Sequence, residues 1–378
     1  HTDPGSITLD VFAGSGTAGV AALLCDKPTD AMVQMANQLG LNPKWGPRRA
    51  VLYELGVLGA FVSKTICSPP EPEHFEQAAL KFVQQAEQDL GWLWDVEDPK
   101  GNRGRFRHAI WSDVLICPHC STETPFWRAV VRRNPLRLED RFSCPSCRKR
   151  SRVVDAERAI ETVFDGLLGK PIARKKRVLA RIHGQTNGKT WQRDATVSDM
   201  EAVVRAEQTP LPAGTPRAEI AWGDLYRSGY HKGISHLHHF YTPRNFLAVA
   251  KLWSMIEQYP EGVRDALKLL VLSYNATHST LMTRVVVKDG QSDFILTGAQ
   301  SGVLYVSGLP VEKNVFEGVR RKIATFKQAF EAVAGSRSTV EVVNASSTKL
   351  NLPDMSVDYG FTDPPFGDYI PYAELNQL

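Results

Sequence analysis

The chain has 378 residues, of which 43% are apolar and 23% charged, and its formal net charge at pH 7 is +4. These values are ordinary for a globular protein with room for two or three domains, and no internal repeat or low-complexity tract interrupts them. No signal peptide is visible and no apolar run reaches the ~18 residues of a membrane span, so the sequence predicts no membrane segment.

The first segment, residues 5–68, reads as strand, glycine turn, helix, strand and helix. We expect a buried strand at 7–12, a helix that opens at 17–24, and a second strand at 50–54 that ends in Glu54. Strand, helix and strand at this spacing predict a parallel sheet.

The pattern then changes. Apolar residues at helical spacing predict a helix over 73–94, and residues 100–155 hold two cysteine pairs and many arginines. Residues 156–168 look helical. Residues 183–220 are polar and contain Gly, Pro and Thr, so they read as a loosely structured connection.

The second half predicts helices, then strands. Residues 243–276 give two helices separated near Pro260, and 316–333 give a further helix. Strands are expected at 282–287, 303–306, 338–343 and 359–362. The simplest account is an α/β fold with one Rossmann-like, doubly wound sheet that a long insertion interrupts. Its expected parts are residues 1–68, 69–310 (the insertion) and 311–378.

Basic residues are concentrated in the insertion, and clustered cations of this kind suit phosphate contacts. The alternative is a solvated basic face. The cluster comprises Arg103, Arg105, Arg107, Arg128, Arg132, Arg133, Arg137, Arg141, Arg148, Lys149, Arg150, Arg152, Arg174, Lys175, Lys176 and Arg177.

The run Gly14-x-Gly16-x-x-Gly19 follows the first strand and opens a helix, which is the context of a nucleoside-cofactor loop. Glycine lets a ligand approach the backbone closely, and the helix N-terminus offers unpaired N–H groups. Glu54, at the end of the second strand, could accept both ribose hydroxyls. The alternatives are a structural glycine turn with a surface glutamate, or a dinucleotide cofactor on this half alone.

The tetrapeptide Asp363-Pro364-Pro365-Phe366 follows the last predicted strand. An exocyclic amine of a nucleobase is a poor nucleophile because its lone pair is delocalised into the ring. The Asp363 carboxylate and the Pro364 carbonyl could accept hydrogen bonds from that amine, while the prolines hold the stretch extended. Phe366 could stack on a base that has left its duplex. The alternative is a proline-stiffened strand exit with an incidental acid.

Two cysteine pairs, Cys117-x-x-Cys120 and Cys144-x-x-Cys147, predict a structural zinc site, because four thiolates complete a tetrahedron and leave no open position. Such a site favours a reducing compartment, so we expect a cytoplasmic protein. The surrounding arginines suggest that this ribbon, about residues 103–155, touches nucleic acid. The alternative is an architectural or protein-docking ribbon.

His119, within the first pair, is not expected to be a ligand. Cys25 and Cys67 are expected to be buried small apolar residues.

Four histidines lie close together in the sequence without an acid at ligand spacing. We expect them to form a polar surface or to contact nucleic acid, in preference to a second metal site. They are His231, His236, His238 and His239.

With these motifs the chain resembles the S-adenosylmethionine-dependent DNA amino-methyltransferases, most nearly the adenine-specific type with an inserted zinc ribbon. The matching pieces cover about a quarter of the chain. They are Leu9 to Thr17, Leu52 to Leu55, the run from Leu352 through Asp368, Cys117 to Cys120, and Tyr241-Thr242-Pro243-Arg244-Asn245.

The resemblance implies catalysis at Asp363, Pro364, Pro365 and Phe366 and a cofactor pocket after the first, second and third strands of the sheet. Where the family often has an acid after the third strand, this chain has Ser346, with Asn344 nearby. The implied cofactor-binding residues are Asp10, Phe12, Ala13, Gly14, Gly16, Thr17, Glu54, Asn344 and Ser346.

The function that the resemblance implies is methylation of a DNA base amine, adenine N6 before cytosine N4, in host modification or phage defence with possible partner proteins. Two alternatives stay open: a catalytically silent nucleic-acid-binding subunit of a larger complex, and an RNA base methyltransferase. The chain begins almost on the first strand and stops twelve residues after Phe366, so we expect it to be part of a longer protein.

Overall fold

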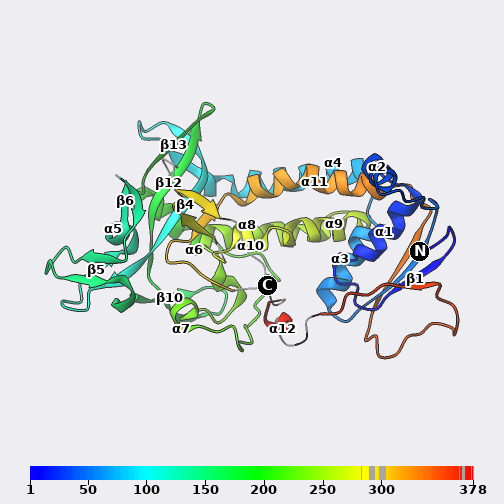
Figure 1. Ribbon diagram of the computed structural model, residues 1–378. Coiled ribbons are helices and arrows are strands. Elements are labelled where there is room, and N and C mark those ends of the chain that lie inside the picture. Colours follow the sequence, from blue (N-terminus) through cyan, green and yellow to red (C-terminus); the bar gives the residue numbers. More distant parts are fainter. Residues whose placement is uncertain are drawn as a thin grey trace. The chain divides into compact units, whose positions relative to one another are not determined.

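The computed structural model (Figure 1) shows a mixed α/β protein with a parallel sheet and a larger antiparallel one. The described residues are 1–133, 135–281, 283–288, 294–297, 304–365, 367, 371–375 and 377. The chain divides into two compact units, which are described one at a time. Unit 1 comprises His1–Phe82, Ile256–Leu272 and Arg320–Ile370, and unit 2 comprises Val83–Met255, Ser273–Val319 and Pro371–Leu378. The domain bounds predicted from the sequence differ from these and stay a prediction.

Unit 1 contains a four-stranded sheet in the order β17-β2-β1-β18, and all three strand pairings are parallel. Its strands are β1 (Ile7–Asp10), β2 (Arg49–Glu54), β17 (Thr339–Asn344) and β18 (Tyr359–Gly360). The parallel pairing predicted between the first two strands is confirmed. Thr8 lies opposite Tyr359, so two segments from nearly opposite ends of the sequence are neighbours in one sheet.

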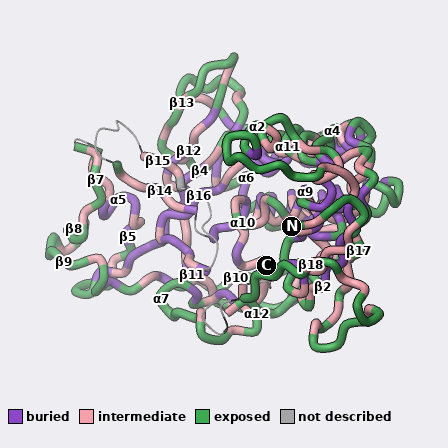
Figure 2. The backbone as a smooth tube through the Cα atoms, turned by 45° about the vertical axis from the view of Figure 1, so that its right-hand side comes forward, coloured by how far each residue is buried: buried purple, intermediate pink, exposed green. Residues whose placement is uncertain are grey.

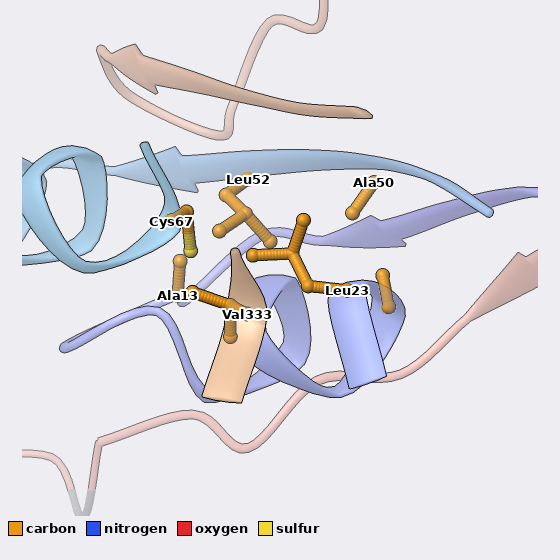
Figure 3. Packing of buried hydrophobic residues seen from close by; sticks show 7 residues of the cluster. Ala13, Leu23, Ala50, Leu52, Cys67 and Val333 are labelled. Carbon is orange, nitrogen blue, oxygen red and sulfur yellow. The ribbon is translucent and has the colours of Figure 1, made fainter. Parts of the chain in front are cut away.

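Apolar side chains of helices pack against this sheet and form a hydrophobic core with it. The helices of this part of the sequence are α1 (Thr17–Asp26), α2 (Asp30–Gln38), α3 (Val57–Cys67), α4 (Pro72–Leu90), α9 (Glu261–Leu272) and α11 (Val315–Val333). Figure 3 shows the apolar cluster in which Leu23 and Val333 meet Leu52. Cys67 belongs to this cluster, and burial raises the pKa of its thiol to about 11. Its predicted apolar role is confirmed, whereas Cys25 is only partly buried.

The first turn of α1 sits directly against the sheet because Gly19 has no side chain. A Cβ at this position would lie 2.7 Å from Cys67 Sγ and 2.8 Å from Leu52 Cδ1. Beside the sheet, α4 and α11 lie side by side (Figure 1), and the Phe75 and Phe330 rings meet edge to face with centroids 5.0 Å apart.

Unit 2 is organised around β4 (Arg103–Ile116), the central strand of an antiparallel sheet in the order β13-β12-β4-β16. The other strands of this path are β12 (Arg177–Thr186), β13 (Lys189–Asp194) and β16 (Val311–Lys313), while β3 (Asp95–Glu97) and β5 (Glu123–Pro125) also pair with β4. This sheet is antiparallel, and apart from β16 its strands lie within the predicted insertion.

Two expectations for unit 2 were wrong. Residues 156–168 do not form a helix: β10 (Ile160–Asp165) pairs antiparallel with β11 (Lys170–Lys175). Residues 183–220 are not a loose connection, since they include β13 and α6 (Val197–Gln208). In β10 the exposed positions include apolar residues, and in β13 both faces are mostly polar. Neither strand therefore shows the alternation of apolar and polar residues that marks a half-buried strand.

Three other expectations agree with the structure. The helix expected at 73–94 is α4 followed by η1 (Gly91–Trp94), and the one expected at 316–333 is α11. The two helices expected within 243–276 are α8 (Pro243–Met255) and α9, which begins directly after Pro260.

Of the strand pair expected at 282–287 and 303–306, β14 (Arg284–Val286) is present, but it pairs with β15 (Ile295–Thr297). The expectation for 303–306 was wrong for its described residues, where only Val306 makes an isolated bridge, to Leu281. Met282 and Val303 lie outside the described residues. In the part of the chain that the structure describes, no helix has both the length and the apolar composition needed to cross a bilayer.

The remaining short elements complete the described chain. The helical ones are α5 (Phe126–Val130), η2 (Val153–Asp155), α7 (Ser228–His231), η3 (Leu237–Phe240), η4 (Ile256–Gln258), α10 (Asn275–His278) and α12 (Tyr372–Leu375). The strands are β6 (Val131–Arg133), β7 (Leu136–Leu138), β8 (Arg141–Ser143) and β9 (Arg150–Arg152).

Candidate functional site

The carboxyl ends of the four parallel strands form one edge of the sheet, and the predicted cofactor and catalytic segments meet there. The Phe361 amide donates to the Leu9 carbonyl (3.0 Å), which continues the pairing of β18 with β1. Beyond it, the Thr362 hydroxyl lies 3.4 Å from Asp10 Oδ1. The glycine loop that follows β1 and the Asp363 segment that follows β18 are therefore side by side.

The glycine loop has a backbone shape that suits glycine at two positions. Gly14 and Gly16 have φ values of 53° and 89°, and Gly16 is the N-cap of α1. A Cβ on Gly16 would lie 2.9 Å from the Cα of Ser63 on α3. The Ser63 hydroxyl in turn donates to the Gly14 carbonyl (2.9 Å). Helix α3 thus supports the loop from below, a role that no motif in the sequence revealed.

Glu54 holds the loop from the end of β2. Its Oε2 accepts the Gly14 N–H at 2.8 Å and its Oε1 accepts the Gly56 N–H at 2.7 Å. On the neighbouring strand, the Asn344 side-chain amide donates to the Glu54 carbonyl (2.8 Å). A carboxylate has about four acceptor sites, so Glu54 keeps capacity for two further donors such as ribose hydroxyls.

Asp10 lies at the centre of this edge and is only 7% exposed. Burial raises the pKa of its carboxyl; hydrogen bonds from the Phe12 amide and the Thr362 hydroxyl oppose that rise, and the negative charges of Glu54 and Asp363 add to it. The carboxylates that follow β2 and β18 thus act on the Asp10 carboxylate at the end of β1. An edge of this charge favours a cationic ligand.

The other predicted cofactor residues surround the same loop. Ala13 is buried and donates its N–H to the Tyr53 carbonyl (3.0 Å), whereas the Phe12 ring and Thr17 are exposed. Ser346 is exposed, and its hydroxyl lies 3.0 Å from that of Thr348 in a local turn. Its contact with a cofactor stays a prediction.

The acid-Pro-Pro segment is accessible. Asp363, Pro364 and Pro365 are all exposed at the exit of β18. Phe366, the predicted stacking residue, lies outside the described residues.

A second site lies in unit 2, where four cysteines converge. The Sγ atoms of Cys117, Cys120, Cys144 and Cys147 all lie within 4.8 Å of one another. Cys117 and Cys147 are 3.8 Å apart, and Cys120 and Cys144 are 3.5 Å apart. Tetrahedral zinc with Zn–S bonds of ~2.3 Å separates its sulfurs by about 3.8 Å, so the cluster fits a zinc ion. All six cysteines of the chain are free thiols.

Matching turns position the four thiols. In each, the residue after the second cysteine of the pair has a positive φ (58° at Ser121, 60° at Arg148), and its N–H donates back to the carbonyl of the first cysteine. These left-handed residues turn the chain so that both sulfurs of a pair face the same point. His119 is exposed and belongs to no potential metal group that the described residues form.

The histidine-rich segment meets an acid that the sequence analysis did not consider. Nε2 of His238 and of His239 lie 2.7 and 3.0 Å from Asp165 Oδ2. Burial opposes the charge on Asp165, but these bonds outweigh it and bring the pKa of the carboxyl to about 2. Burial also lowers the pKa of both histidines.

The hydrogen bonds of His239 argue against a second metal at this cluster. The Ser235 N–H donates to His239 Nδ1 (3.1 Å), so the ring proton is on Nε2, the atom that faces Asp165. A metal would need that nitrogen unprotonated, and the proton would then move to Nδ1 and oppose Ser235 N–H. The cluster lines a cavity of about 770 Å³, none of whose walls comes from the parallel sheet.

The Thr242-Pro243-Arg244 stretch, one of the matching pieces, turns its polar groups inward. Arg244 and Glu312 are buried and paired at 2.5 Å, and the Thr242 hydroxyl donates to Glu312 at 2.6 Å. The Trp111 indole N–H from β4 donates to the same carboxylate (2.8 Å). This stretch therefore ties α8 to β16 and β4 and is structural.

Comparison with known proteins adds nothing to these two sites. No protein-family model, no curated protein and no solved structure matched the chain. The resemblance drawn from the motifs therefore rests on the residues described above.

Proposed function

We propose that this chain transfers a methyl group from S-adenosylmethionine to an exocyclic amine of a DNA base, adenine N6 before cytosine N4. The observation that carries the proposal is the parallel pairing of β18 with β1, which brings Asp363 next to the glycine loop. The two motifs are 349 positions apart, from Gly14 to Asp363, and their meeting at one sheet edge is what a cofactor-plus-base site requires.

The order of the strands supports the same reading. When the four strands of the unit 1 sheet are numbered by their position along the chain, their order across the sheet is 3-2-1-4. This is the order of one half of a Rossmann-like sheet extended across its switch point, where the direction of strand addition reverses. Ligands of such sheets bind at the carboxyl ends of the strands beside that point, which here lies between β1 and β18.

The charge of the edge supports a cationic cofactor. The negative charges of Glu54 and Asp363 raise the pKa of Asp10, and a positively charged ligand relieves that repulsion. The cofactor's sulfonium and ammonium groups are positive. We assign Glu54 to the cofactor's ribose and the glycine loop, where no side chain blocks close approach of a ligand, to the wall of the cofactor pocket. Phe12 offers an exposed ring nearby. When bound, the cofactor supplies an electrophilic methyl group.

The chain's own part in the reaction is to prepare the amine. The Asp363 carboxylate and the Pro364 carbonyl accept hydrogen bonds from the two N–H groups, which localises the nitrogen lone pair. Attack of the nitrogen on the cofactor's methyl carbon would break the bond from that carbon to sulfur, and Asp363 would take up one amine proton along its hydrogen bond. The exposure of Asp363 lets an extruded base reach it.

Asp363→Ala tests this assignment. We expect methyl transfer to DNA to fall by at least the ~10²-fold that loss of a positioned proton acceptor costs, while cofactor binding by calorimetry stays within twofold. Glu341→Ala, which removes an exposed carboxylate of β17 away from the edge, serves as the control and should retain activity. Full activity of the Asp363 variant would overturn the catalytic assignment.

The same measurements separate the alternatives. A chain that binds cofactor and DNA without transfer in any variant is a silent subunit. A chain that methylates structured RNA in preference to DNA is an RNA methyltransferase. A cytoplasmic location and partners from a modification or defence system belong to this proposal and stand or fall with the DNA activity.

A further inference from the structure

The β8–β9 hairpin that carries the second cysteine pair is unusually rich in cations. Residues 141–152 include five (Arg141, Arg148, Lys149, Arg150 and Arg152) and no Asp or Glu. All five are exposed, and much of the hairpin is drawn as exposed in Figure 2.

Strand pairing gathers three of these cations on one face. Phe142 and Ser151 lie opposite each other and are buried, so the residues that alternate with them point outward. Arg141 and Arg152 are directly opposite each other, and Arg150 is two positions from Arg152 on the same strand. Like charges directly across an antiparallel pair destabilise it, so the hairpin alone gains nothing from this arrangement.

Arginines of the neighbouring β6–β7 hairpin form ion pairs. On β6 and β7, Arg133 pairs with Asp194 at 2.9 Å and Arg137 pairs with Glu139 at 3.1 Å. Within the described chain, by contrast, the side chains of Arg141, Arg150 and Arg152 make no ion pair. The outward face of β8–β9 therefore carries three arginines that form no ion pair among the described residues.

A local explanation is that these cations balance the zinc centre, since four thiolates on one Zn²⁺ leave a net negative charge. Arg148 and Lys149 lie in the turn beside Cys147 and suit that role. Arg141 and Arg152 are at the other end of the hairpin, and their side chains leave the face opposite to buried Phe142. Balance of the zinc charge therefore does not account for Arg141 and Arg152.

We infer that the outward face of β8–β9, with Arg141, Arg150 and Arg152, binds the phosphate backbone of duplex DNA. Regularly spaced phosphates offer each of the three guanidiniums its own anion, and Arg binds them through two parallel N–H bonds. The contacts are to the backbone, so they hold the duplex without reading its sequence. This inference rests on the proposed function only in taking DNA as the partner.

The test compares two double variants that remove the same charge. Arg150→Gln/Arg152→Gln alters the unpaired face, and Arg133→Gln/Arg137→Gln alters the paired one. Binding of the full chain to a fluorescent duplex of random sequence is measured by anisotropy from roughly 50 to 200 mM salt. We expect the first variant to bind about tenfold more weakly and its log–log salt slope to shrink by about 1.8, that is 0.9 for each lost phosphate contact. The second variant should change the slope by much less.

Zinc content and cofactor binding are measured on the same samples. Equal losses in both variants, or a loss confined to zinc content, would overturn the inference and leave the cations as partners of the metal. A weakening seen with duplex RNA and not with DNA would overturn it as well. A chain that binds DNA through this face but transfers no methyl group keeps the inference and rejects the proposed function. If the chain transfers methyl groups and Arg150→Gln/Arg152→Gln leaves DNA binding unchanged, the proposed function is kept and the inference is rejected.

Discussion

At the scale of single residues, the site depends on how tightly the glycine loop is enclosed. Gly14 is fixed from two sides, by the Glu54 carboxylate at its N–H and by the Ser63 hydroxyl at its carbonyl. Gly16 is enclosed by α3, because a Cβ on Gly16 would lie only 2.9 Å from the Cα of Ser63. The loop therefore has its shape before any ligand binds, which reduces the ordering cost of binding.

Gly16→Ala tests this enclosure, and Gly5→Ala is a matched control. Both glycines have φ near 90°, so in both variants an alanine must adopt a left-handed backbone conformation, which costs ~1–2 kcal/mol. A Cβ on Gly5 meets nothing within 4 Å, whereas one on Gly16 lies 2.9 Å from Ser63. We expect Gly16→Ala to cost about 1–3 kcal/mol more in unfolding free energy and to abolish cofactor binding, which calorimetry would detect. Equal stability of the two variants would contradict the close contact with α3.

A residue of the site could be predicted from the sequence when its partners lie close to it along the chain. Gly14, Gly16 and Glu54 lie within one strand–helix–strand unit, whose pattern is local, and the structure brings them together. Ser63 and Thr362 were missed because a single serine or threonine carries no pattern. Asp165 was missed because 73 positions separate it from His238, and no local spacing signals such a contact.

At the scale of elements, the sequence predicted helices and buried strands better than exposed hairpins. The apolar residues of α4 and α11 recur at helical spacing, and both helices begin within one residue of expectation. In β10, Ile160 and Phe164 point to solvent, and Phe164 is 71% exposed, so apolar residues there do not mark a buried face. Hydrophobic periodicity cannot report a strand whose apolar side is outside.

The zinc module makes a prediction at this scale. We expect one zinc ion per chain by elemental analysis, and Cys144→Ser should remove it, because Cys144 is buried among the four thiols. The control is Cys25→Ser, which replaces a partly buried free thiol outside the cluster and should keep the metal. Full zinc content in the Cys144 variant would show that the cluster is not the metal site.

At the scale of the whole molecule, buried neutral histidines make stability depend on pH. Burial, with the nearby charges of His183, Arg107 and Lys313, lowers the pKa of His108 on β4 from 6.5 to about 3. His231, His238 and His239 are shifted in the same direction by burial. Between pH 6.5 and 3 the unfolded chain therefore binds more protons than the folded one, and stability falls as the pH falls through this window.

His108→Gln should weaken that dependence. One histidine that titrates only when unfolded contributes up to about 1.4 kcal/mol per pH unit, and the variant loses this contribution. Thermal melting between pH 7 and pH 5 should therefore show a smaller decrease in melting temperature for His108→Gln than for the unsubstituted protein. His74→Gln, at an exposed position of α4, should melt as the unsubstituted protein does. Parallel curves for all three proteins would show that His108 is protonated in the folded state.

The pairing of β1 with β18 also fixes when the site can form during synthesis. The strand at residues 7–10 leaves the ribosome some 350 residues before its neighbour at 359–360. At about 5–20 residues per second, the first strand waits for tens of seconds with one edge unpaired. Any chain released before residue 359 can carry a complete zinc module and still lack the place where cofactor and base would meet.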